Sequence, residues 1–93
     1  MLPVVFTTSA RVEILDARAW YEARQGRLAE QFDTDLEAVI ARIGENPRQF
    51  RLIRGKARRA IFRHFPYGIF FRILPDRVQV VACLHTSRDP RRW

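Results

Sequence analysis

Four side chains in the C-terminal half have the types that acid–base and phosphate chemistry requires: His85, Arg88, Arg59 and Arg63. An imidazole exchanges protons near neutral pH, and guanidinium groups stabilise negative charge on a phosphate. Together they would form a minimal set for metal-independent cleavage of RNA by attack of its 2′-hydroxyl. Other side chains that serve as general acids or bases are scarce nearby. Residues 47–93 contain no Glu, one Lys and no Tyr after Tyr67.

Neither a metal site nor another cofactor is expected. Cys83 is the only cysteine and lies in an apolar run, so it is interpreted as a small buried hydrophobe. The two histidines, His64 and His85, have no neighbouring ligands at metal spacing. His64 precedes a predicted turn and is interpreted as structural.

The charge of the chain is divided unevenly between its halves. Residues 1–46 hold five basic and eight acidic side chains, whereas residues 47–93 hold twelve basic and two acidic ones. Clustered cations raise the local concentration of anionic ligands. The basic half therefore favours a polyanionic target or an acidic partner.

Length and composition indicate a small globular protein. The 93 residues are predicted to form a single domain, 1–93, and the 47% apolar fraction excludes a disordered chain. No apolar run approaches the roughly 18 residues of a membrane span, and the N-terminus lacks the basic region of a signal peptide. We expect a cytoplasmic protein with no membrane partner.

The first elements are predicted from local signals. Residues 2–7 are rich in β-formers and predict a strand. Thr8 and Ser9 offer N-cap oxygens for a helix over residues 10–24, which we expect to end where Gly26 takes a left-handed conformation.

A second helix is predicted from an apolar stripe, which comprises Leu28, Phe32, Leu36, Val39, Ile40 and Ile43. Gly44 and Asn46-Pro47 end it, because the residue before a proline is pushed out of the helical region. The two helices are expected to form an antiparallel hairpin. Residues 48–57 then form a basic connection that has room for a short strand.

From Arg58 onward the apolar pattern has the period of two that is typical of strands. Turns at Pro66-Tyr67-Gly68 and Pro75-Asp76 divide it into a three-stranded antiparallel meander. The predicted fold class is α+β: an N-terminal strand, a two-helix hairpin and this meander. Regular alternation would place five polar side chains on the open face of the sheet, away from the helices: Arg59, Arg63, Arg72, Gln79 and His85.

Six short motifs in a fixed order carry a family resemblance. They are Phe6-Thr-x-x-Ala10, Trp20-Tyr21-Glu22, Asn46-Pro47, Arg58-Arg59, Phe65-Pro66-Tyr67 and His85-x-x-Arg88-Asp89-Pro90-x-x-Trp93. Over nearly the whole chain, their order and intervals resemble the ParE branch of the RelE/ParE toxin superfamily.

The resemblance implies a bacterial toxin of a type II toxin-antitoxin system that causes growth arrest. A cognate, ParD-like antitoxin would bind and neutralise it in a hetero-oligomer. ParE-type toxins inhibit DNA gyrase by binding, and this is the function we expect. The alternative is a ribosome-dependent mRNA interferase of the RelE type, an endoribonuclease, because both activities occur on this fold.

The resemblance also suggests two sets of contact residues. The target-binding set is His85, Arg88, Arg91, Arg92 and Trp93. The antitoxin-binding set is Trp20, Arg58, Arg59, Arg63 and Arg72. Structural roles remain open for several of them. Arg58 and Arg59 would pair with Glu37 or Asp35, Trp20 would pack beneath the second helix, His85 would hold the tail or a neighbouring strand, and Trp93 would fill a groove.

Overall fold

The computed structural model describes residues 2–87. Within them the chain forms five strands, two α-helices and one 3-10 helix. In chain order the elements are β1 (Val4–Phe6), α1 (Thr8–Arg24), α2 (Gly26–Glu45), η1 (Pro47–Gln49), β2 (Leu52–Arg54), β3 (Ala57–Ile61), β4 (Tyr67–Ile73) and β5 (Val78–His85).

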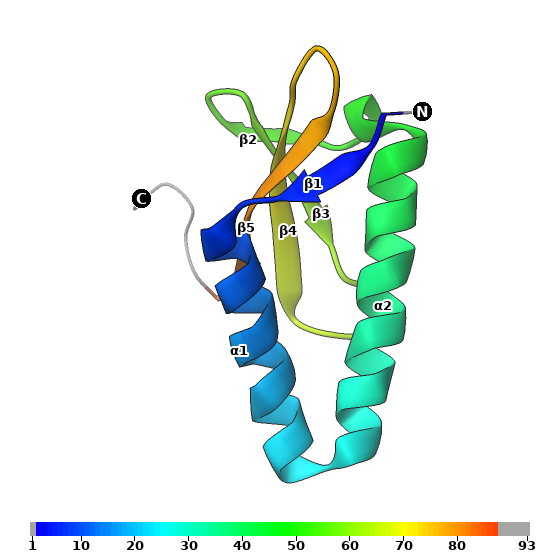
Figure 1. Cartoon of the computed structure of the whole chain (residues 1–93), viewed down its shortest axis with the longest axis vertical. Coiled ribbons are helices and arrows are strands. Elements are labelled where there is room, and N and C mark those ends of the chain that lie inside the picture. Colours follow the sequence, from blue (N-terminus) through cyan, green and yellow to red (C-terminus); the bar gives the residue numbers. More distant parts are fainter. Residues whose placement is uncertain (1, 88–93) are drawn as a thin grey trace.

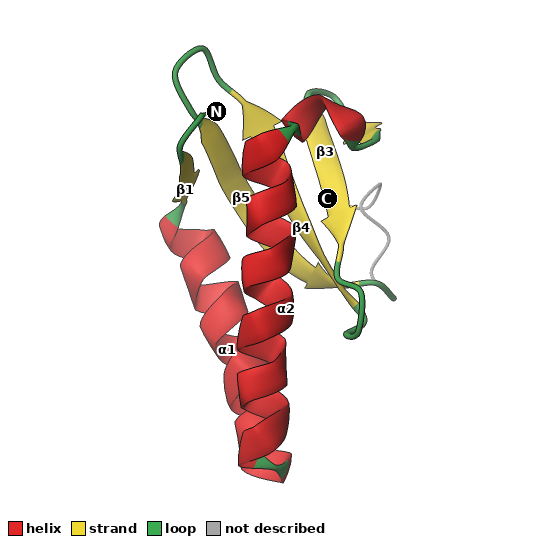
Figure 2. Ribbon diagram, turned by 90° about the vertical axis from the view of Figure 1, so that its right-hand side faces the viewer, coloured by secondary structure: helices red, strands yellow, loops and turns green. Residues whose placement is uncertain are grey.

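All five strands belong to one sheet with the order β1-β5-β4-β3-β2 (Figure 1). The pairs β2–β3, β3–β4 and β4–β5 are antiparallel, whereas β1 runs parallel to β5. The predicted α+β fold is confirmed, with β1 and β2 extending the meander at its two edges. Both helices lie on the same side of the sheet (Figure 2).

The start of α1 differs from the prediction. Thr7 is the N-cap residue, and its Oγ1 accepts a hydrogen bond of 3.1 Å from the Ala10 backbone N–H. Thr8 already belongs to the helix, so the cap assigned to Thr8 and Ser9 was wrong by one residue. Thr7 is favoured because its own N–H donates to the Val80 carbonyl, which ties the cap to the sheet.

The junction between the helices also differs from the prediction. Gln25 takes an extended conformation between α1 and α2, and Gly26 is the first residue of α2. Among the described residues, Gly55 alone has a positive φ, at 54°. A left-handed Gly26 is therefore not what closes α1; a single extended residue reverses the chain.

The core lies between the helix hairpin and the sheet. Its largest fully buried side chains are Phe32, Phe71, Ile43, Ile69, Val39, Val78 and Val80. These residues come from α2, β4 and β5, and removing a large aliphatic or aromatic side chain from such a site costs about 2–5 kcal/mol. A second, smaller cluster of Phe70, Ala82 and Leu84 packs on the open face of the sheet.

The alternation of β5 breaks at Val81. Phe70 is paired with Ala82 and Phe71 with Val80, so Val81 is an extra residue in a β-bulge. A bulge reverses the facing of every following residue. Cys83 therefore joins the helix-side core, and His85 is paired with Tyr67 at the end of the same face.

The bulge overturns part of the predicted open face. Arg59 is paired with Phe70, and Arg72 is paired with Gln79, so Arg59, Arg72 and Gln79 lie on the open face as predicted. The prediction for His85 was wrong, because the regular alternation did not allow for an extra residue. Arg63 follows the end of β3 and is not part of the open face.

Candidate binding surfaces

A hollow of about 400 Å³ lies where α1 meets the ends of β4 and β5. The residues around it are Glu13, Asp16, Ala17, Trp20, Tyr67, Cys83, Leu84 and His85. Trp20 is 50% exposed, so the alternative of packing beneath the second helix does not hold. Trp20 and His85 were assigned to different sets, and the fold brings them to one hollow.

His85 is held in place by its neighbours. Its Nδ1 accepts a hydrogen bond of 3.1 Å from the Ser87 backbone N–H and lies 2.9 Å from the Ser87 Oγ. Its ring packs edge-on against Tyr67, with 5.3 Å between the ring centroids. Because Nδ1 accepts from a backbone N–H, the neutral tautomer is assigned its proton on Nε2.

Glu13 links the wall of the hollow to β5. Its Oε1 accepts a hydrogen bond of 2.8 Å from the Cys83 backbone N–H. The Cys83 thiol is buried, as predicted. Burial, with a smaller contribution from the Glu13 carboxylate, raises the pKa of the Cys83 thiol to about 12. At neutral pH this thiol is protonated and is a poor nucleophile.

Two of the predicted arginines have distinct environments. Arg58 Nη1 donates to the carbonyls of Phe50, at 2.7 Å, and Arg48, at 3.4 Å. It therefore fixes the connection between η1 and β3, and it does not pair with Glu37 or Asp35. Arg59 of β3 is paired with Phe70 of β4, and its side chain lies against Gly68, where an added Cβ would approach the Arg59 Cγ to 3.3 Å.

Asp35 is a structural anchor that sequence reasoning missed. It is 4% exposed, and its carboxylate accepts hydrogen bonds from the backbone N–H groups of Arg63, at 3.3 Å, and His64, at 2.8 Å. The His64 Nδ1 lies 3.7 Å from the same carboxylate. The available signal was an acidic residue on the apolar face of the second helix, three positions after Phe32 and four before Val39.

The position of Arg63 follows from that anchor. Arg63 and His64 border a second hollow, of about 510 Å³, between α2 and the turn after β3. The other lining residues are Leu28, Gln31, Thr34, Asp35, Ala38 and Phe65. Arg63 thus lies beside α2, on a different surface from Arg59 and Arg72.

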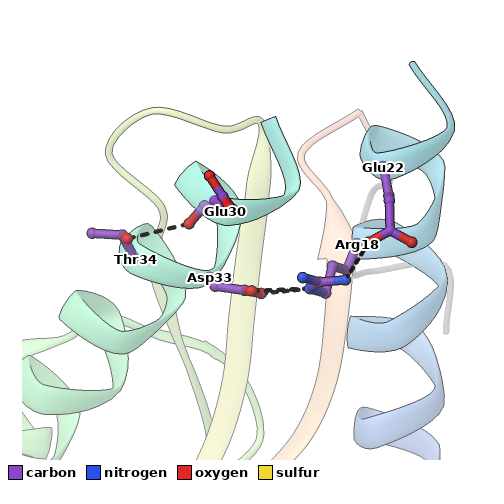
Figure 3. Close-up of polar contacts among 5 residues, drawn as sticks. All are labelled: Arg18, Glu22, Glu30, Asp33 and Thr34. Atoms are coloured by element: carbon purple, nitrogen blue, oxygen red, sulfur yellow. Dashed lines mark hydrogen bonds and ion pairs between the residues drawn. The ribbon is translucent and has the colours of Figure 1, made fainter. Parts of the chain in front are cut away.

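Polar contacts fix the helix hairpin from outside. Arg18 of α1 points toward Asp33 of α2 and toward Glu22 on its own helix (Figure 3). The Arg18 Nε lies 2.9 Å from the Asp33 Oδ1, and its Nη1 lies 2.9 Å from the Glu22 Oε2. Hydrogen bonds to these two carboxylates raise the pKa of Arg18, and the bond to Asp33 makes the larger contribution.

Several predicted site residues cannot be placed. Arg88, Arg91, Arg92 and Trp93 lie outside the described residues.

Within residues 2–87, no group of three or more His, Cys, Asp or Glu side chains is arranged to hold a metal ion. In the same part of the chain, no helix is long and apolar enough to cross a membrane.

The helix hairpin over an antiparallel-rich sheet defines a class, the small α+β proteins with the RelE/ParE toxin fold. A sequence model described as "ParE toxin of type II toxin-antitoxin system, parDE" matches residues 4–90. The chain belongs to this ParE toxin family, and the predicted resemblance is confirmed. No curated protein sequence matches it significantly.

A solved structure has the same fold. Its description is "Chromosomal ParDE TA system from P. aeruginosa", and the two chains superpose with a TM-score of 0.79. The match covers 91% of this chain and 96% of the other, at 15% sequence identity. At that identity the similarity shows a common fold.

Proposed function

We propose that this toxin inhibits DNA gyrase by binding it, and that a cognate, ParD-like antitoxin neutralises it. Membership of the ParE toxin family supports both parts of the proposal. The site of action would be the bacterial cytoplasm, where gyrase and DNA are found. The domain that acts would be the whole chain, residues 1–93.

The observation that favours binding over RNA cleavage is the dispersal of the nuclease candidates. His85 lies at the helix-side hollow, Arg59 on the open face, and Arg63 beside α2. Proton transfer and phosphate stabilisation must act on one substrate group at the same time. Three candidates on three surfaces do not meet that requirement.

The proposed target surface is His85 with the residues that follow it. Ser87 fixes the imidazole of His85 at the start of the tail. The tail supplies Arg88, Arg91, Arg92 and Trp93, a combination of arginine and aromatic residues that is typical of binding hot spots.

The proposed antitoxin surface combines exposed apolar residues with arginines. Val12, Leu15 and Trp20 on α1 are 50%, 62% and 50% exposed. Such side chains suit the apolar anchors of a segment that folds on binding, while Arg58, Arg59, Arg63 and Arg72 suit its acidic residues. Arg58 would contribute the donors that the two backbone carbonyls leave unused.

A pair of assays tests the proposed function. Purified toxin is added to a gyrase supercoiling and cleavage assay, and separately to a coupled translation assay. We expect loss of supercoiling with translation intact, and relief when the cognate antitoxin is added. Cleaved mRNA with unaffected gyrase would instead identify an interferase.

A truncation tests the target surface. A chain lacking residues 91–93 is expected to lose growth arrest while keeping its circular dichroism spectrum and its affinity for the antitoxin. Unchanged toxicity of a folded truncated chain would remove these three residues from the mechanism.

A further inference from the structure

The segment from residue 47 to residue 75 carries eight basic residues and no acidic one. Four of its cations line two hollows, of about 420 Å³ and about 230 Å³. Both hollows are bordered by Arg48, Lys56 and Ile73, so they adjoin. We call this surface the basic trough and define it by Arg48, Lys56, Arg58 and Arg72.

Separate elements bring the four cations together. Arg48 belongs to η1, Arg58 to β3 and Arg72 to β4, while Lys56 lies in the turn between β2 and β3. That turn requires Gly55, whose φ of 54° is in the left-handed region that favours glycine. The trough is therefore a product of the fold, because its members are up to 24 positions apart in the chain.

The guanidinium groups of the trough are partly fixed before any ligand arrives. Arg58 Nη1 donates to two backbone carbonyls, and Arg72 Nη2 lies 3.2 Å from the Gln79 Oε1. Within residues 2–87, none of the four trough cations is paired with a carboxylate. A preorganised and uncompensated cation loses less entropy when it binds an anion.

We propose that the basic trough binds the phosphodiester backbone of nucleic acid without reading its base sequence. Four cations around two adjoining hollows suit a polyanionic ligand, and each neutralised phosphate releases counterions. The trough residues described by the structure include no aromatic side chain on which a base would stack. The contact is therefore to phosphates and not to bases.

At Arg48 and Lys56, which the proposed antitoxin set does not include, the distribution of apolar residues favours nucleic acid over an acidic peptide. Peptide partners gain most of their affinity from buried apolar anchors. The described residues include six exposed large apolar side chains, of which Val5, Val12, Leu15 and Trp20 lie on β1 and α1. β1 and β2 form opposite edges of the sheet, so these anchors are remote from the trough, where Leu52 is the one such side chain.

The test measures binding of the full-length chain to fluorescein-labelled duplex DNA of arbitrary sequence by anisotropy, with labelled single-stranded RNA in parallel. The trough variant is R48Q/K56Q, because these residues belong to neither the proposed target set nor the proposed antitoxin set. The control variant is R24Q/R27Q, which removes the same charge where α1 ends and α2 begins. This junction is the tip of the helix hairpin in Figure 1. Salt is varied from about 50 mM to about 200 mM.

The trough variant is expected to bind DNA at least about tenfold more weakly at low salt. The slope of log K against log salt concentration is negative, and its magnitude should decrease by about 2, because two phosphate contacts are lost. The control should keep the wild-type slope. If the double variant is unstable, K56Q alone should decrease the magnitude of this slope by about 1. Stronger binding of RNA than DNA, with the same dependence on the trough, would identify RNA as the source of the phosphates.

Three results would overturn the proposal. The first is no measurable binding of either nucleic acid by the wild-type chain, and the second is an equal effect of the trough and control variants. The third is that the trough variant binds a polyglutamate peptide more weakly than the wild-type chain does but binds nucleic acid equally well. Gyrase is absent from these measurements, so their outcome is independent of the proposed inhibition.

Discussion

At the scale of single residues, Asp35 anchors the turn after β3 to α2. It is an acidic side chain within the apolar face of α2, where a carboxylate is expensive to bury without partners. Two backbone N–H groups of the turn after β3 supply those partners. The carboxylate thereby holds Arg63, His64 and the following Phe65-Pro66-Tyr67 segment against the helix.

Replacing Asp35 with alanine is expected to lower the free energy of unfolding by about 2–3 kcal/mol. The reason is that two hydrogen bonds to a charged group are lost and two backbone donors are left without it. Urea denaturation followed by circular dichroism measures the change.

Asp33→Asn is the matched control, because its carboxylate pairs with Arg18 on the surface. Its cost should stay below about 1 kcal/mol, as for other exposed ion pairs. Equal costs for D35A and D33N would show that Asp35 does not anchor the turn.

Cys83 gives the protein a pH-dependent stability at alkaline pH. The folded-state pKa of its thiol, about 12, is above the ordinary value of 9.0. Its contribution is therefore fully present below about pH 9 and is lost as the pH rises toward 12, because the unfolded chain then releases a proton that the folded chain retains.

We expect the wild-type chain to lose more stability than C83A between about pH 9 and about pH 11, within the window set by the two pKa values. Thermal unfolding at a series of pH values, with C83A alongside, isolates the thiol from tyrosine and lysine titration. Parallel curves for the two proteins would contradict the raised pKa. Native Cys83 should also resist iodoacetamide at pH 8.

At the scale of elements, the cap of α1 links the first helix to the sheet. The Thr7 side chain accepts from the Ala10 N–H, and the Thr7 N–H donates to the Val80 carbonyl of β5. One residue thus ends the pairing of β1 with β5 and begins α1.

Thr7→Ala is expected to destabilise the protein by about 1 kcal/mol, the usual cost of losing an N-cap side chain. Thr8→Ala, one position later, should change stability by no more than about 0.5 kcal/mol, since Thr8 is an exposed residue within the helix. Chemical denaturation of both variants distinguishes the two assignments. A larger effect at Thr8 would restore the cap that the sequence suggested.

The bulge in β5 is the element-scale feature with the greatest effect on the proposed site. With Val81 unpaired, Cys83 and His85 turn toward the helix side, while Ala82 and Leu84 turn to the open face. His85 consequently lies beside Trp20 and Tyr67 at the α1 hollow.

At the scale of the whole molecule, most of the exposed large apolar side chains and the basic trough lie at opposite edges of the sheet. The edge formed by β1, with α1 beside it, carries the exposed Val5, Val12, Leu15 and Trp20. The opposite edge, at β2, carries the basic trough. Arg58 and Arg72 belong both to the trough and to the proposed antitoxin set, so the two proposed ligands would share these residues.

A binding mechanism and a catalytic mechanism predict different behaviour for His85→Ala. If the toxin acts by binding, the half-inhibitory concentration should rise by about tenfold, which corresponds to about 1.4 kcal/mol, and full inhibition should return at higher toxin concentration. A gyrase supercoiling titration measures this shift. H64A is the control, because the His64 imidazole borders a different hollow.

A catalytic role would give a different result. Loss of His85 would then lower the rate of RNA cleavage at every toxin concentration, and additional toxin would not restore the wild-type rate. That outcome would contradict the binding mechanism.

Local patterns in the sequence were sufficient for the first strand, the two helices and the three-stranded meander, but not for η1. The apolar stripe from Leu28 to Ile43 predicted α2, and the period of two after Arg58 predicted the meander, because both depend on residues that are neighbours in the chain. The family resemblance could likewise be recognised from motifs at fixed intervals. The concentration of basic residues in the second half is a property of composition alone.

Only the tertiary structure decided which side chains share a surface. The facing of His85 depends on a bulge, and a bulge is defined by the pairing of two strands and not by either strand alone. Asp35 has partners 28 and 29 positions away, and the basic trough gathers cations from four segments. Such features depend on packing between residues that are far apart in the chain. The candidate chemistry of His85, Arg59 and Arg63 could therefore be recognised from their residue types in the sequence. That the three side chains lie on different surfaces could not.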